Sequence, residues 1–174
     1  MQNFDAENKL EQAARLFIAN NLLQNNSAKR SLDSVFRHLD KVLVEGVITR
    51  DELKIALERI HGKDNSVKVE QLLQSTFDRV DVNKDGVIEY AEFIAAAADD
   101  SILLTRHNLK KTFDEFDKGK TGTITVEDLN ALCSGEQKKI MSRRDARRIM
   151  RRVDLNGDGK ITFEEFCELM QRRS

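Results

Sequence analysis

Proline and tryptophan are absent from this sequence of 174 residues, glycine occurs only 8 times, and tyrosine occurs once. All-β folds depend on Gly and Pro for their many turns, so this scarcity favours helices. No stretch approaches the roughly 18 consecutive apolar residues of a membrane-spanning helix, and we therefore expect no transmembrane segment. Charged residues make up 34% of the chain but leave a net charge of only −1, so net charge alone predicts no nucleic-acid partner.

Cysteine is also scarce, with Cys133 and Cys167 as its only occurrences. They form no C-x-x-C pair, and no histidine lies at ligand spacing from either. Both occupy apolar positions of helical patterns, which predicts buried and reduced thiols. Reduced thiols are typical of a cytoplasmic protein, and that is the location we expect.

One motif recurs along the chain. An aspartate is followed five residues later by glycine and seven residues later by isoleucine at Asp81, Asp117 and Asp154, and a damaged copy lies near Asp40. Apolar residues spaced i, i+3 and i+4 flank the copies and predict a helix on either side. Four helix–loop–helix copies suggest two pairs, each joined by a short β-bridge between isoleucines. The expected partners are Ile48 with Ile88 and Ile124 with Ile161.

Two of the loops have the donors that Ca²⁺ requires. Calcium is a hard cation that takes six to eight oxygens, which a loop supplies from side chains at positions 1, 3 and 5, a carbonyl at 7, position 9 and a bidentate glutamate at 12. Glycine at position 6 permits the sharp turn. We expect one Ca²⁺ in each of these loops; the alternative is a polar turn between helices. The donors are Asp81, Asn83, Asp85, Val87 through its carbonyl, Glu89 and Glu92 in the second loop, and Asp154, Asn156, Asp158, Lys160 through its carbonyl, Thr162 and Glu165 in the fourth.

The third loop is a weaker candidate. Gly119 at position 3 has no side-chain oxygen, Thr121 at position 5 is neutral, and Asp128 at position 12 is one carbon shorter than glutamate. A shorter acid favours six-coordinate binding, which suits Mg²⁺ better, so a weak Mg²⁺ site and an empty loop both stay open. The remaining candidate donors of this loop are Asp117 and Thr123.

The first loop should bind no ion. Counting back from Gly46 puts Lys41 at position 1 and Leu43 at position 3, and neither is a calcium ligand. Its expected role is structural, as the partner of the second loop.

Helix starts are marked by a threonine or serine followed three residues later by an acid, the pattern of a capping box. These signals predict an all-α fold of two lobes, residues 27–100 and 101–174, with an N-terminal junction helix in residues 1–26. A break between the lobes is expected at residues 99–101. The capping boxes are Thr49 with Glu52, Thr125 with Asp128, Ser142 with Asp145 and Thr162 with Glu165.

The N-terminal segment has an apolar face at helical spacing. This face could bind in the groove of a lobe or pack permanently as an extra core helix, and the sequence leaves both open. The polar stretch of residues 20–31 should hold the turn into the first repeat. The residues of the apolar face are Leu10, Ala13, Ala14, Phe17 and Ile18.

Six arginines between residues 143 and 152 form a basic stripe on one expected helix. The stripe could bind an acidic partner or nucleic acid, but we favour a solvated face because no aromatic residues interleave for base stacking. No phosphate-binding loop, kinase motif or Ser-His-Asp or Cys-His arrangement occurs, so we expect no catalysis by this chain.

The four repeats resemble the EF-hands of the calmodulin superfamily. Residues 8–19 are similar to the Asn-Lys-Leu-x-x-Ala-Ala/Leu-x-x-Ile-Ala stretch that joins kinase to sensor in the calcium-dependent protein kinases of plants and protists. The resemblance continues to the C-terminus, although the first and third loops depart from members with four ion sites.

This resemblance implies a regulatory domain that switches a Ser/Thr kinase domain in the same polypeptide, with the N-terminal helix as the ligand of a lobe. Calcium would open the lobes, and the lobes would grip that helix anew. Two other classes stay open: a free-standing adaptor of calmodulin or centrin type, which needs a separate target helix, and a calcium buffer, which barely opens on binding.

Overall fold

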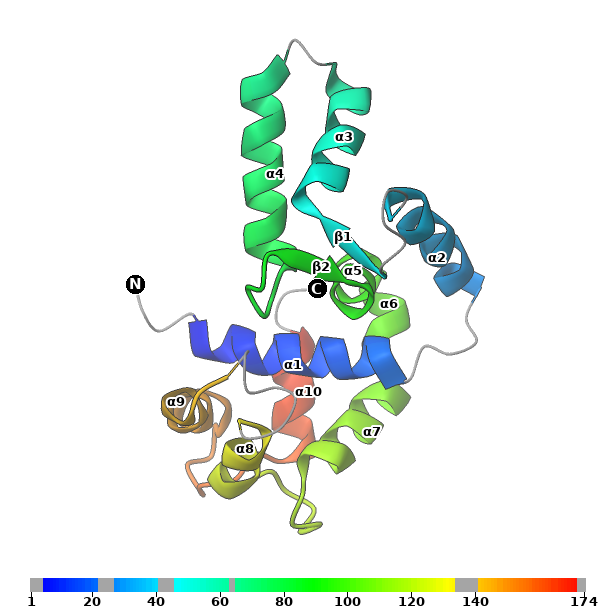
Figure 1. The fold of residues 1–174 in the computed structure, drawn as a ribbon. Helices are drawn as coiled ribbons and strands as arrows, with labels where there is room; N and C mark the ends of the chain where they lie inside the picture. The colour runs from blue at the N-terminus through cyan, green and yellow to red at the C-terminus, as the bar shows by residue number, and fades with distance from the viewer. Residues whose placement is uncertain (1–4, 22–26, 41–45, 63–64, 134–140, 172–174) are drawn as a thin grey trace. The chain divides into compact units, whose positions relative to one another are not determined.

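The computed structural model describes residues 5–21, 27–40, 46–62, 65–133 and 141–171, and it confirms the all-α prediction (Figure 1). Within the described residues, no helix is both long and apolar enough to cross a membrane. The elements are α1 (Asp5–Asn21), α2 (Ser27–Leu39), β1 (Val47–Thr49), α3 (Arg50–His61), α4 (Ser66–Val80), β2 (Val87–Glu89), α5 (Tyr90–Ala97), α6 (Asp100–Leu103), α7 (Arg106–Phe116), α8 (Val126–Leu132), α9 (Arg143–Val153) and α10 (Phe163–Gln171).

The chain divides into two compact units. Unit 2 is Leu23–Ala98, and unit 1 joins Met1–Leu22 to Asp99–Ser174. The N-terminal helix α1 is thus part of the same unit as the third and fourth repeats. The assignment of residues 1–26, 27–100 and 101–174 as three functional domains stays a prediction.

Unit 2 pairs the first two repeats. Its strands β1 and β2 run antiparallel with Ile48 opposite Ile88, which confirms the predicted bridge. Both isoleucines are buried, and they join a core in which Phe36 from α2 and Phe77 from α4 meet. The Phe36 ring also stands edge-on to Tyr90 at a centroid distance of 5.2 Å, so α2 is packed onto α5 as well.

Unit 1 pairs the third and fourth repeats in the same way. Ile124 and Ile161 form the predicted antiparallel bridge, with both side chains fully buried. Their backbone groups exchange hydrogen bonds of 2.9 and 2.8 Å. Phe113, Phe116 and Phe166 form the aromatic centre of this unit through edge-on ring contacts.

The four predicted capping boxes are confirmed. In three of them the side chain and the acid three residues later satisfy each other's backbone amides at the starts of α3, α8 and α9. The fourth box joins Thr162 to Glu165 at the start of α10. A fifth box, which the Thr/Ser pattern did not predict, joins Glu89 to Glu92 at the start of α5.

Two connections can be compared with the sequence prediction. The stretch of residues 20–31, expected to hold the turn into the first repeat, contains the end of α1 at Asn21 and the start of α2 at Ser27. This polar stretch contains neither Gly nor Pro, so nothing in it prevents helix formation. At the expected break, Asp99 accepts a hydrogen bond from the Ser101 amide and caps the short helix α6, the first element of unit 1 after the break.

Candidate metal centres

The second loop runs from the end of α4 to the start of α5 and is organised around Asp81. This aspartate is buried, and its carboxylate accepts hydrogen bonds from the amides of Asp85 at 3.2 Å and Gly86 at 3.0 Å. Asn83 Oδ1 also accepts from the Asp85 amide, at 3.0 Å. Gly86 has φ +90°, a left-handed conformation that favours glycine and that turns the chain back across the loop.

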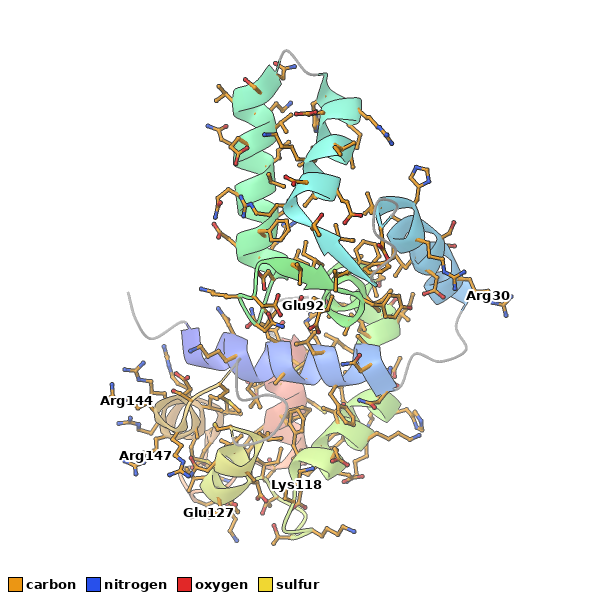
Figure 2. The ribbon with its side chains drawn as sticks, viewed as in Figure 1. Arg30, Glu92, Lys118, Glu127, Arg144 and Arg147 are labelled. Atoms are coloured by element: carbon orange, nitrogen blue, oxygen red, sulfur yellow. The ribbon has the colours of Figure 1, made fainter. Side chains whose placement is uncertain are left out.

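Glu92 closes this loop from the first turn of α5 and is only 2% exposed (Figure 2). Its Oε1 accepts hydrogen bonds from the amides of Val82 at 2.8 Å and Asn83 at 3.2 Å, and its Oε2 accepts from Glu89 at 2.9 Å. Burial raises the pKa of Glu92, and the nearby Asp81 charge adds to this, although the amide hydrogen bonds act in the opposite direction. The Glu92 carboxylate, at position 12, is therefore hydrogen-bonded to the backbone at positions 2 and 3 and ties the end of the loop to its beginning.

The fourth loop repeats this arrangement. Asp154 accepts hydrogen bonds from the amides of Asp158 at 3.2 Å and Gly159 at 2.8 Å, and Gly159 has φ +81°. Glu165 Oε1 accepts from the Leu155 amide at 2.8 Å, and its Oε2 accepts from both the amide and the hydroxyl of Thr162 at 2.9 Å. Burial acts to raise the pKa of Glu165, but these hydrogen bonds outweigh it and hold the pKa below its usual value.

The donors and backbone of both loops fit a hard cation. The side chains at positions 1, 3, 5, 9 and 12 all carry oxygen, and position 7 offers its carbonyl. The glycine at position 6 has the required left-handed conformation, and the acids at positions 1 and 12 each accept hydrogen bonds from amides of their own loop. The described residues contain no three His, Cys, Asp or Glu side chains already gathered round one point, because the loop carboxylates turn toward amides. The assignment of the two donor sets as ligands stays a prediction.

The third loop closes through its own hydrogen bonds. Asp117 accepts from the amides of Thr121 at 3.0 Å and Gly122 at 2.7 Å, while Asp128 accepts from Gly119 at 3.0 Å and from the Thr125 amide at 2.8 Å. Burial acts to raise the pKa of Asp128, but its hydrogen bonds lower it on balance.

The two remaining candidate donors of the third loop bind each other. The Thr121 hydroxyl donates to the carbonyl of Thr123 at 3.0 Å. The loop thus has the same shape as its neighbours with one donor fewer, which fits a supporting role, and the alternative of Mg²⁺ stays untested.

The first loop is described only at its ends. The prediction that it binds no ion rests on Lys41 and Leu43, which lie outside the described residues. Asp40 Oδ2 accepts from the Gly46 amide at 3.0 Å, as the first aspartate of the other loops does from its glycine. Glu52 is buried and serves the capping box of α3.

Helix α1 is buried in unit 1 against α6, α7, α9 and α10. Of the predicted apolar face, Leu10, Ala13, Ala14 and Ile18 are fully buried. Phe17 is half-buried and packs edge-on against Phe116 with ring centroids 6.1 Å apart.

The buried face of α1 is wider than the sequence analysis proposed. Leu16 is 8% exposed and Ala19 is 2% exposed, so both belong to it. The unbroken apolar run of residues 16–19 was the signal for this, because a helix that is apolar over more than one stripe is buried on more than one side.

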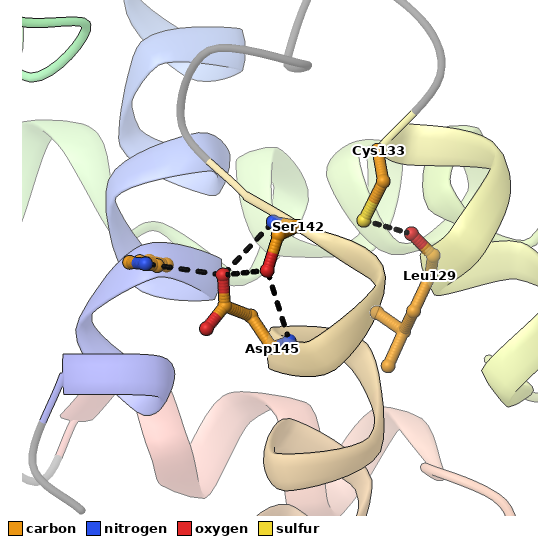
Figure 3. Close-up of polar contacts among 5 residues, drawn as sticks. Leu129, Cys133, Ser142 and Asp145 are labelled. Carbon is orange, nitrogen blue, oxygen red and sulfur yellow. Dashed lines mark hydrogen bonds and ion pairs between the residues drawn. The ribbon is translucent and has the colours of Figure 1, made fainter. Parts of the chain in front are cut away.

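Among the described residues, ion pairs of Lys9 and Arg15 hold α1 in this position. Lys9 Nζ lies 3.0 Å from Asp145 Oδ2, and Arg15 Nη1 lies 2.6 Å from Asp100 Oδ1 (Figure 3 shows the first). Asp145 also accepts hydrogen bonds from the amide and hydroxyl of Ser142 at 2.9 and 2.7 Å. Burial acts to raise the pKa of Asp145, but Ser142 and Lys9 together hold it below its usual value. Sequence spacing gave no signal for either pair, since the partners lie far apart in the chain.

Comparison with known proteins gives consistent results. A family model described as an EF-hand domain pair matches residues 29–98 and 106–171. The chain is 36% identical over 172 residues to calcium-dependent protein kinase 19 of Oryza sativa subsp. japonica, covering 98% of this chain and 30% of that protein. It is also 36% identical over 172 residues to calcium-dependent protein kinase 2 of Zea mays, covering 98% and 32%.

A protist relative gives a similar match. Calcium-dependent protein kinase 4 of Plasmodium falciparum (isolate 3D7) is 30% identical over 177 residues, covering 98% of this chain and 33% of that protein. The chain thus spans about a third of the length of the curated relatives it matches, and the matches include its N-terminal helix.

Proposed function

We propose that this chain, which belongs to the EF-hand domain pair family, binds Ca²⁺ through its second and fourth loops and thereby switches an attached Ser/Thr protein kinase domain. The observation that carries the proposal is the position of α1 against α9 and α10, the two helices that flank the fourth loop. Its relatives are named calcium-dependent protein kinases and match along nearly the whole chain, which supports the same arrangement here. The buried, free cysteines support the cytoplasmic location.

The glutamates at position 12 connect the loops to the helices that follow them. Glu92 lies on the first turn of α5 and Glu165 on the first turn of α10. Bound Ca²⁺ would supply a divalent charge shared by the loop carboxylates. For Glu165 to share it, its carboxylate must turn from the Leu155 amide toward Asp154, and α10 must follow. The same reasoning applies to Glu92 and α5.

We propose that the movement of α10 changes the packing of α1. Helix α1 packs on both α9 and α10, so a change in the angle between them alters the surface that it occupies. We treat Leu10, Ala13, Ala14, Phe17 and Ile18 as the face that is held and released. A permanently packed core helix would instead stay in place when calcium binds.

The binding free energy of two calcium ions is sufficient to drive such a switch. Moving a two-state equilibrium from 1:99 to 99:1 requires about 5.5 kcal/mol of differential binding. Two ions, each favouring one state by roughly 100-fold, supply that amount, whereas one ion does not. Both complete loops are therefore needed for full switching.

The proposal is tested on the intact protein that contains this chain. Kinase activity is measured against calcium concentration for the wild type, Glu92→Gln and Glu165→Gln, with Glu164→Gln as the matched control on the same helix turn. Glu164 is exposed, and among the described residues its one ion pair is with exposed Arg106 at 3.7 Å. We expect both loop variants to lose most activation and the control to keep it. Full activation of either loop variant would contradict the switch.

A second experiment distinguishes a regulatory switch from a calcium buffer and from a free-standing adaptor. Fluorescence of a dye that binds apolar surface is recorded for this chain with and without calcium. A switch exposes apolar surface on binding, whereas a buffer leaves the fluorescence unchanged. Calcium-independent activity of the intact protein, together with calcium-dependent binding of a separate helical peptide, would favour an adaptor.

A further inference from the structure

A cavity of about 640 Å³ opens between α8 and α9 of unit 1, and five arginines of α9 line it. Figure 2 shows Arg144 and Arg147 extending outward from α9, and Glu127 on α8. We call this cavity the arginine groove. Its charged lining residues are Arg143, Arg144, Arg147, Arg148, Arg151 and Glu127.

Helix stability does not account for these arginines. Arg143 and Arg147, Arg144 and Arg148, and Arg147 and Arg151 are like charges four residues apart, an arrangement that destabilises a helix. Arg143 and Arg144 also lie in the first turn of α9, where the helix dipole disfavours cations. Such departures from local rules are expected where a surface serves binding.

Internal ion pairing does not account for them either. In the part of the chain that the structure describes, none of the five arginines forms an ion pair with a carboxylate, and all five are exposed. Arg151 donates a hydrogen bond to the backbone oxygen of Arg147 at 3.2 Å, which leaves most of its guanidinium donors available. The groove is thus a concave surface of concentrated positive charge on a chain whose net charge is only −1.

The spacing of the arginines matches one class of ligand. Residues four apart on a helix are separated by about 6 Å along its axis, and alternate side chains of an extended peptide by about 6.6 Å. Carboxylates at alternating positions of an extended segment would therefore meet successive guanidinium groups, whose planar donors suit carboxylate oxygens. The row from Arg143 to Arg151 is about 12 Å long and covers about four residues of such a segment.

We propose that the arginine groove binds an extended acidic segment of a protein partner, with carboxylates at alternating positions. The concave shape fits a peptide chain better than a flat membrane surface. Among the described residues that line the groove, none is an aromatic side chain on which nucleic-acid bases could stack. Because the arginines are exposed, salt screens the attraction, and affinity falls as ionic strength rises. Glu127 on the opposite wall opposes an acidic ligand.

The test uses the full 174-residue chain and a fluorescein-labelled peptide of sequence Glu-Ser-Glu-Ser-Glu-Ser, followed by fluorescence anisotropy at low and at physiological salt. We expect salt-sensitive binding that falls at least about tenfold in Arg144→Glu/Arg147→Glu. The matched control, Lys68→Glu/Lys111→Glu, makes the same change in net charge at exposed positions outside the groove and should lower affinity far less.

Two further variants keep the result interpretable. Charge reversal at Arg144 and Arg147 removes like-charge pairs from α9, so it should not unfold the helix, and circular dichroism verifies this. Arg144→Gln/Arg147→Gln should give an intermediate loss. Glu127→Gln should strengthen binding several-fold, because it removes the opposing charge from the groove.

Any of three results would overturn the proposal. The first is that the wild type does not bind the peptide at low salt. The second is that the groove and control variants lose affinity equally, which would indicate an effect of net charge alone. The third is that phosphatidylserine vesicles or a single-stranded oligonucleotide bind through the groove while the peptide does not.

Discussion

Replacing Lys9 with methionine removes the ion pair with Asp145 that anchors α1 in unit 1 and keeps most of the apolar stem. Lys9 is 26% exposed and Asp145 is 7% exposed at the side chain, so the pair is neither a surface pair nor a fully buried one. After the change, Asp145 keeps its two hydrogen bonds from Ser142 and is not stranded.

The expected loss of free energy that holds α1 in unit 1 lies between the values for exposed and for fully buried ion pairs. Exposed ion pairs contribute up to about 1 kcal/mol, and breaking a fully buried pair costs about 3–5 kcal/mol. The retained Ser142 contacts favour the lower part of this interval, so we expect α1 to be destabilised by about 1–2 kcal/mol. In hydrogen–deuterium exchange with mass spectrometry, this corresponds to α1 amides exchanging about five to thirty times faster.

The pH dependence has a defined sign. The pKa of Asp145 is lowered in the folded state, so its contribution to stability is present above its unfolded pKa of about 3.9 and is lost as pH falls through the folded value. Lys9→Met should therefore differ most from the wild type near neutral pH and converge with it in acid. Lys54→Met, which removes an exposed pair with Glu70 at 3.7 Å in unit 2, is the matched control and should leave α1 exchange unchanged.

Unchanged exchange of α1 in Lys9→Met would refute this reasoning. So would equal acceleration in the wild type and Asp145→Asn backgrounds, because a real pair must show coupling in the double variant.

Three further changes test other parts of the molecule. Leu10→Ala removes a fully buried side chain and should destabilise the seating of α1 by about 2–5 kcal/mol, seen as a loss of exchange protection confined to unit 1. Ile161→Ala empties the bridge position opposite Ile124 and should weaken calcium binding at the fourth loop in a titration, while the second loop keeps its affinity. Gly119→Asp restores the missing donor of the third loop. A Cβ there meets the Thr121 methyl group at 3.3 Å and the carboxylate oxygens of Asp128 and Asp117 at 3.7 and 3.9 Å, so the substitution should fold and add a third, weaker binding event.

The sequence predicted the loops and their pairing well because both depend on short-range chemistry. The bridges of Ile48 with Ile88 and of Ile124 with Ile161 follow from a repeated spacing and appear in the structure as expected. The capping boxes were equally accessible, since the two partners lie three residues apart. The capping role of Glu89 was missed because an acid at position 9 of such a loop indicates a ligand first.

The position of α1 could not be predicted from local patterns. Its apolar face indicated burial, either in the groove of a lobe or as a core helix, but not in which unit, because both units offer apolar helices. The choice rests on contacts between distant parts of the chain, such as Lys9 with Asp145 and Arg15 with Asp100, and on the packing of Phe17 against Phe116. The i, i+3, i+4 spacing indicates one apolar face, whereas α1 is covered by four helices and is buried more widely than that face.

Calorimetric titration of the 174-residue chain with calcium tests the central claim most directly. We predict two binding events for the wild type at micromolar calcium, one for Glu92→Gln, one for Glu165→Gln and none in that range for the double variant. Heat that persists undiminished in the double variant, or a wild type that takes up no calcium, would contradict the account.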